Sequence, residues 1–425
     1  MIRKQITLFA SVIVLGHSLL AEPLPFKTAI QLALRNSAQM GIAVSDQDRA
    51  YSGYLEARNQ FIPQLYFGSG IGASFGFPLG APSIFNVNSQ SLLYNAAARD
   101  FTKAAKIDVR AAQFSKEERR SQVVLDAALT YTELDKLLAA VSLLRQQEAA
   151  ALRVEDIVNQ RIQAGIESQV EGTRAKLNTA RIRLKQAEVR SSIENLRIHL
   201  GALTGLPVAQ IETVSESIPQ LPAVSQDDDL LDKTVSYSPL YKSALETANA
   251  KAFRASGEHK QMRPAVDLVG QYALFSKFNN YEDFYRKFER NNGAFGVQIR
   301  FPFFNRAQSA HAEQADAEAV RARREADTVK EQVSTETVKL QRAVAQLDAA
   351  KEVARLEYQL ARADTETVTA HVESGTANLR EQEQARLAEN DRYSAFLDAT
   401  YDLEKGQMQL LRAIGEIENW ALSSH

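Results

Sequence analysis

The sequence predicts a mainly α-helical, internally duplicated protein in which each half also contributes a pair of β-strands. Three observations support this prediction. The chain repeats itself, its aromatic residues gather in two windows, and two runs of 68 residues contain neither proline nor glycine. With 425 residues, the chain is long enough for two or three ordinary domains.

The repeat has a period of about 210 residues. Gly375 follows Gly165 by 210 positions, and the residues around the first glycine recur around the second; Gly415 follows Gly205 by the same offset. A period this long indicates a duplicated half-protein rather than a short solenoid unit. The predicted segments are a signal peptide (1–21), a first repeat (22–205), a connector (206–237), a second repeat (238–420) and a tail (421–425). The first repeat is predicted to contain a short helix, strands 65–77 and 84–94, and a long helical hairpin that turns at residue 165. The second is predicted to contain strands 265–276 and 293–304 and a long helical hairpin that turns at residue 375.

The first residues have the pattern of a secretory signal peptide. Arg3 and Lys4 form a charged start, residues 6–15 are apolar, and residues 19–21 offer a cleavage site. A membrane anchor is the alternative, but about 10 apolar residues are too few to span a bilayer of roughly 30 Å. The chain has no cysteine, which excludes a lipid-modified N-terminal cysteine.

The aromatic residues mark four predicted strands. Of 33 Phe, Tyr and Trp residues, seven lie in 61–94 and eleven in 271–304, at corresponding places in the two halves. Within these windows apolar side chains alternate with small or polar ones, which is the period of a β-strand. The apolar positions are Leu65, Phe67, Ile71, Ala73, Phe75 and Phe77; Phe85, Val87 and Leu93; Val266, Leu268, Tyr272 and Leu274; and Phe295, Val297, Ile299 and Phe301.

Two kinds of sheet fit this alternation. One is a sheet packed on a soluble core, and the other is a transmembrane barrel with lipid outside, water inside and aromatic residues at the interfaces. Four strands cannot close a water-filled barrel, because lumen width grows with strand number. If these are barrel strands, several chains share one barrel, and three copies supply twelve strands.

The runs without proline or glycine predict two very long helices, at 96–163 and 307–374. At 1.5 Å per residue, each reaches roughly 100 Å. Their equal lengths indicate that both span the same distance. The segment after the first long helix carries a heptad seam, which predicts close packing against neighbouring helices. The seam residues are Val170, Thr173, Leu177, Ala180, Leu184, Ala187 and Ser191.

Each long helix is expected to turn at a glycine, Gly165 or Gly375, because glycine tolerates the left-handed conformation that ends a helix. The next helix then begins at a capping residue. Ser168 with Glu171 resembles a capping box, and the corresponding offset in the second half holds Asn378 and Glu381.

No pattern in the sequence indicates an enzyme. The six histidines show no metal-ligand spacing, cysteine is absent, and there is neither a nucleophile elbow nor a Walker phosphate loop. Positive and negative side chains are interspersed and the net charge is −2, so nothing points to nucleic acid. We therefore expect no catalytic residue, no metal and no cofactor.

The duplicated plan resembles the TolC-like family of outer-membrane efflux proteins. The resemblance rests on the opening segment 24–37, on the strand-to-helix joints 93–95 and 303–305, and on the turns at Gly165 and Gly375. It extends over essentially the whole chain after residue 21. No single motif is specific, but their order and spacing are.

The resemblance implies a homotrimer in the outer membrane that extends into the periplasm. Its fold would be a trimeric twelve-stranded barrel continuing into a long α-helical, coiled-coil barrel. Its function would be the exit duct of a tripartite efflux or type I secretion system, with a periplasmic adaptor protein, an inner-membrane transporter and outer-membrane lipid as partners. Loops 78–83 and 277–292 would lie at the cell surface. The alternative is a secreted, self-inserting pore or a rod-like surface adhesin.

The resemblance also implies two sets of site residues. The periplasmic aperture would be formed by Glu171, Glu381, Glu383 and Gln384. The helical tips that dock the adaptor would comprise Gly165, Ser168, Gly375, Thr376, Asn378 and Leu379. Ala377 stands where some relatives use an arginine in the gate, so this chain departs from their pattern.

Overall fold

The computed structural model describes residues 23–70, 83–222, 230–275 and 289–423. The predicted signal peptide, the outer part of strand 65–77 and most of the two predicted cell-surface loops lie outside the described residues. No helix in the described part of the chain is both long and apolar enough to cross a membrane.

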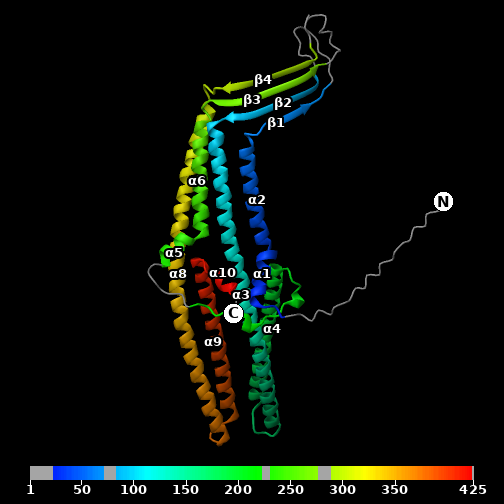
Figure 1. Cartoon of the computed structure of the whole chain (residues 1–425). Helices are drawn as coiled ribbons and strands as arrows, with labels where there is room; N and C mark the ends of the chain where they lie inside the picture. Colours follow the sequence, from blue (N-terminus) through cyan, green and yellow to red (C-terminus); the bar gives the residue numbers. More distant parts are fainter. Residues whose placement is uncertain (1–22, 71–82, 223–229, 276–288, 424–425) are drawn as a thin grey trace, which may run out of the picture. The chain divides into compact units, whose positions relative to one another are not determined.

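The chain divides into two compact units. Figure 1 labels the helices and strands that they contain. The first takes the residues up to Asn36, Asp126–Gln220 and the residues from Ala421 onward; the second takes Ser37–Leu125 and Leu221–Trp420. The first unit contains α1 (Phe26–Asn36), the later part of α3 (Ala96–Gln163), α4 (Gln169–Thr204), η1 (Val208–Gln210) and η2 (Ser215–Ser217). The second contains α2 (Ala38–Asn59), β1 (Gln64–Gly68), β2 (Ser83–Tyr94), the start of α3, α5 (Leu230–Tyr237), α6 (Pro239–Lys260), β3 (Ala265–Phe275), β4 (Asn291–Arg300), α8 (Arg306–Glu373), α9 (Leu379–Ile414) and nearly all of α10 (Ile417–Ala421).

The helices reproduce the predicted duplication. The long helices α3 and α8 have 68 residues each, and the return helices α4 and α9 have 36 each. The described residues contain four glycines with positive φ, and they lie at the ends of these helices: Gly165 (74°), Gly205 (76°), Gly375 (78°) and Gly415 (82°). Other residues pay a steric penalty in that conformation, so glycine ends each helix and lets the chain turn.

The strands form one antiparallel sheet in the order β1-β2-β3-β4. The register aligns Phe67 with Val87, Val87 with Tyr272, and Tyr272 with Gly293, so the apolar positions share one face. This face is exposed in the single chain: 69% of Phe67 and 81% of Phe295 are accessible. The predicted fold class, mainly helical with four strands per chain, is thereby confirmed.

The last strand is shorter than predicted. The pattern places its end at residue 304, but β4 ends at Arg300, and residues 301–305 form no regular structure. Pro302 explains the difference, because proline has no N–H to donate to a ladder and restricts the residue before it. The aromatic side chains of Phe303 and Phe304 therefore belong to the strand–helix joint, where they are 97% and 79% exposed.

Tyr131 joins three segments of the first unit. Its side chain is fully buried, and its ring contacts that of Phe26 edge-on, with 5.3 Å between ring centroids. The hydroxyl donates to the Leu24 carbonyl at 2.6 Å and accepts from the Val214 N–H at 2.8 Å. One buried tyrosine on α3 thus holds both the start of the described chain and the segment that follows α4.

In the second unit, α3 and α6 are joined by an ion pair whose acidic partner is buried. The Asp100 side chain on α3 is 5% exposed and accepts hydrogen bonds from Lys260 and, at 2.7 Å, from Ser256. Nearby, the packing is close enough that a Cβ added to Gly257 would lie 2.6 Å from the Phe101 ring. These contacts fix α6 against α3 just before β3 begins.

Candidate functional site

Opposite the exposed apolar face described above, the sheet has a second face that is polar. Its cross-strand partners include Tyr66 with Asn88, Asn88 with Gln271, and Asp267 with Gln298. Asp267 forms an ion pair with Arg300 across the β3–β4 ladder, with 2.7 Å between Oδ2 and Nη2. The sequence predicted the polarity of this face, but it could not predict the ion pair, which depends on the register of β3 and β4.

The first tip (residues 161–174) is a tight helical turn in the first unit. The Arg161 carbonyl accepts from the N–H groups of Ile166 and Glu167, at 2.9 and 3.3 Å. The guanidinium of Arg161 also lies 3.4 Å from the Glu167 carboxylate. The predicted Ser168 capping box is wrong, because the Ser168 side chain makes no capping hydrogen bond. Glu171 instead pairs with Arg174 at 2.7 Å, one helical turn on.

The second tip (residues 371–384) lies in the second unit and has a different polar network. The His371 carbonyl accepts from the Thr376 N–H at 2.8 Å, and the imidazole Nδ1 lies 2.9 Å from the Thr376 hydroxyl. Asn378 and Glu381 form the capping box that the sequence predicted. The Glu381 carboxylate therefore lies against the start of its own helix, where it accepts from Asn378.

The predicted aperture residues differ in exposure. Glu381 and Gln384 are exposed, whereas Glu171 and Glu383 are partly buried. Glu171 belongs to the first unit and the other three to the second. Of the predicted docking residues, Gly165, Ser168, Gly375, Thr376 and Asn378 are exposed, and the side chain of Leu379 lies outside the described ones.

Burial raises the pKa of Glu383, and the nearby Arg386 opposes this shift only in part. The folded pKa therefore lies above the unfolded value, so the stability linked to protonated Glu383 is present below the unfolded pKa. This stability is lost as pH rises through the folded pKa.

We expect Glu383→Gln to raise the stability of the chain at pH 7 and to leave it nearly unchanged at pH 4, where the native carboxyl is largely protonated. The gain should be a fraction of a kcal/mol, because water still screens a partly exposed group. Denaturant unfolding at both pH values measures it. Glu381→Gln is the control and should lower stability slightly, since it removes a negative charge from the first turn of α9. A Glu383→Gln effect equal at the two pH values would contradict the burial argument.

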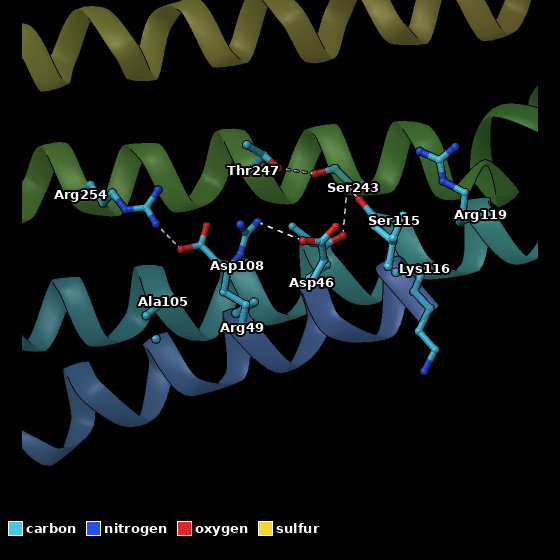
Figure 2. A pocket seen from close by; sticks show the side chains of 16 residues that line it. Asp46, Arg49, Ala105, Asp108, Ser115, Lys116, Arg119, Ser243, Thr247 and Arg254 are labelled. Atoms are coloured by element: carbon cyan, nitrogen blue, oxygen red, sulfur yellow. Dashed lines mark hydrogen bonds and ion pairs between the residues drawn. The ribbon is translucent and has the colours of Figure 1, made fainter. Parts of the chain in front are cut away.

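A groove of about 600 Å³ lies between α2, α3 and α6 in the second unit (Figure 2). Its lining combines alanines with charged and hydroxyl side chains from the three helices. Asp108 pairs with Arg254, and the Ser115 and Ser243 hydroxyls are 2.7 Å apart. Burial raises the pKa of Asp108, and Arg254 opposes the shift. The paired charges hold α6 against α3, and the lining presents no nucleophile–base arrangement that could perform catalysis.

Within the described ranges, no group of His, Cys, Asp or Glu side chains could hold a metal ion. The two-faced sheet and the two hairpin tips are the candidate functional features that the sequence predicted and the structure describes. Sequence patterns predicted both, because a strand period and a helix-ending glycine are local signals.

Comparison with known proteins gave matches of structure alone. No family model and no curated relative matches the sequence. Among solved structures, a membrane protein of Pseudomonas aeruginosa aligns with a TM-score of 0.78 and 17% identity over 92% of both chains. The CmeC outer-membrane channel of Campylobacter jejuni aligns with a TM-score of 0.78 and 16% identity over 92% of this chain and 85% of that one. The open state of the MtrE outer-membrane channel of Neisseria gonorrhoeae aligns with a TM-score of 0.76 and 16% identity over 94% of this chain and 91% of that one.

These alignments define the class of fold. The chain has the fold of outer-membrane channel proteins over nearly all of its length. The TolC-like fold that the sequence motifs indicated is confirmed on this basis. At 16–17% identity the likeness concerns the fold, and function is argued separately below.

Proposed function

We propose that this chain is one subunit of a homotrimeric outer-membrane channel. The observation that carries the proposal is the sheet. In the described ranges it has four strands, with β1 and β4 as the outer ones, and a face whose aromatic and aliphatic side chains are exposed in the single chain. Four strands cannot enclose a water-filled lumen, but twelve can. Three copies joined β4 to β1 would pair the outer strands, place the apolar face in lipid and turn the polar face toward water.

The helices support a duct that continues into the periplasm. Each long helix measures about 100 Å, and each returns through a second helix after one glycine turn. We propose that the helices of three copies form a tube. Its role would be the exit duct of a tripartite efflux or type I secretion system, fed by an inner-membrane transporter.

The two tips are the proposed contact with a periplasmic adaptor protein. Both are tight turns with exposed backbone, and their polar networks differ: an arginine–glutamate pair at the first and a histidine–threonine pair at the second. An adaptor would therefore meet two chemically distinct tips on every subunit. The proposed aperture acids, Glu171 and Glu381, are each already held by a neighbour in their own helix.

The membrane assignment predicts a face-dependent effect of charge. Phe295→Lys places a charge on the apolar face, where the wild-type ring is 81% exposed, and should cost roughly 2–4 kcal/mol per chain in a bilayer. We expect it to abolish heat-resistant trimers in outer-membrane fractions. Gln298→Lys, on the polar face of the same strand, is the matched control and should leave the trimers intact.

Two measurements test the proposal directly. Light scattering of detergent-purified protein should give the mass of three chains, and the same material should conduct ions in planar bilayers. A monodisperse monomer that stays soluble without detergent would overturn the proposal and favour a secreted pore or a rod-like adhesin. If the Phe295→Lys and Gln298→Lys variants formed heat-resistant trimers to the same extent, the assignment of the apolar face to lipid and the polar face to water would be wrong.

A further inference from the structure

The polar face of the sheet carries very few charges. In the four strands as described, the charged residues are Asp267 on β3 and Arg300 on β4. The other long polar side chains on this face are neutral. They are mainly amides and include Gln64, Asn86, Asn88, Gln90, Gln271 and Gln298. The Asp267–Arg300 pair is therefore the main source of the electrostatic field along the described part of this wall.

The two charges are unequally exposed. The Asp267 side chain is 2% exposed, whereas that of Arg300 is 57% exposed. A solute in water beside the sheet therefore meets the guanidinium first and the carboxylate behind it. The pair behaves as a dipole with its positive end outward.

The contact leaves much of the guanidinium available. Nη2 lies 2.7 Å from Oδ2, yet within the described residues this buried oxygen accepts no aligned hydrogen bond. A guanidinium has five N–H donors in a planar fork that matches carboxylate and phosphate oxygens. Asp267 contacts the guanidinium through Nη2 alone, so the other nitrogens of Arg300 remain available to a solute.

The position of Arg300 along the chain is equally specific. It is the last residue of β4, opposite Ala265 in the ladder, and the irregular joint to α8 follows it. Ile299 and Phe301, its neighbours in sequence, are 55% and 69% exposed and belong to the apolar side. In the proposed channel, Arg300 therefore faces the lumen where the barrel meets the helical tunnel.

We propose that Arg300 forms an anion-attracting ring in the lumen, with one guanidinium from each of three subunits, and that it favours solutes carrying carboxylate or phosphate groups. This inference rests on the proposed channel function. Charged rings set the preference of wide pores for one sign of ion, and a low-dielectric wall strengthens their field. Asp267 is a positioning residue that fixes the guanidinium at the wall.

The experiment is a reversal-potential measurement in planar bilayers under a KCl gradient. Arg300→Gln should lower the chloride-to-potassium permeability ratio by about threefold, the effect of one unit charge near an ion path in water. Arg300→Lys keeps the charge and should keep most of the ratio. Gln298→Asn is the matched control: Gln298 lies on the same face of β4, two residues before Arg300, and this neutral change should leave the ratio unchanged.

A purely structural ion pair predicts a different outcome. Arg300→Gln would then lower the yield of channels without changing the ratio, and Arg300→Lys would not restore it. If the Arg300→Gln protein fails to insert, the Asp267→Asn variant is measured instead. It leaves the guanidinium without its counter-charge and should raise the chloride-to-potassium permeability ratio. Conducting channels with an unchanged ratio overturn this inference alone. Absence of conductance in the wild type overturns the proposed function as well.

Discussion

Gly415→Ala is expected to lower the free energy of unfolding by more than about 3 kcal/mol, the upper range for overpacking a close contact. Two effects combine at this position. Gly415 has φ of 82°, and a Cβ there would overlap the ring of Tyr237, on α5 of the same unit. The Tyr237 ring, which is 41% exposed, would have to leave its present position to admit the Cβ. Thermal unfolding followed by circular dichroism measures the loss.

Gly375→Ala separates the two effects. Gly375 has φ of 78°, but a Cβ there would meet no atom within 4 Å. This variant should therefore lose only the conformational part, roughly 1–2 kcal/mol. Equal losses in the two variants would show that the Tyr237 contact contributes nothing and that left-handed strain alone decides both sites.

Lys260→Met is expected to destabilise the protein by about 1–3 kcal/mol, because it removes the main partner of the buried Asp100 carboxylate, while Ser256 and the nearby Lys103 remain. The matched control is Lys251→Met on the same helix. Lys251 pairs with Glu318 at 2.7 Å, but both side chains are at least one-third exposed, so its loss should cost less than about 1 kcal/mol. Denaturant unfolding of the two variants measures the difference, and a Lys260 effect as small as that of Lys251 would contradict the buried-pair argument.

The Asp100 pair should also make the protein sensitive to acid. Burial acts to raise the pKa of Asp100, but hydrogen bonds from Lys260 and Ser256 outweigh it and hold the pKa below its usual value. A lowered folded pKa stabilises the protein above the unfolded pKa, and this contribution is lost as pH falls through the folded pKa. Unfolding curves between pH 6 and pH 3 should therefore converge for wild type and Asp100→Asn.

Local patterns in the sequence predicted most of the fold. The absence of proline and glycine from two runs, and a glycine at the end of each, placed α3 and α8 to within one residue. A two-residue alternation assigned the two faces of the sheet correctly, because one face must avoid water and the other must not. Both signals act over a few neighbouring residues and need no knowledge of tertiary contacts.

The candidate sites were less predictable, because they depend on contacts between distant residues. The partnership of Asp267 with Arg300 requires the register of β3 against β4. The partial burial of Glu383 depends on how α9 packs. At the first tip, Ser168 and Glu171 have the spacing of a capping box, yet the Ser168 side chain makes no capping hydrogen bond and Glu171 pairs with Arg174. The spacing of a sequence motif indicates which side chains could interact, but the surroundings of each side chain determine which contacts form.

The outer strands of the sheet have a consequence for biogenesis. In a lone subunit, β1 and β4 would each present unpaired backbone N–H and C=O groups along one side. Each such group costs several kcal/mol in hydrocarbon, so an isolated subunit could not reside stably in a bilayer. Under the proposed assembly, membrane insertion and subunit association must be a single coupled step. Newly exported chains would then need protection from strand-to-strand aggregation until three of them meet.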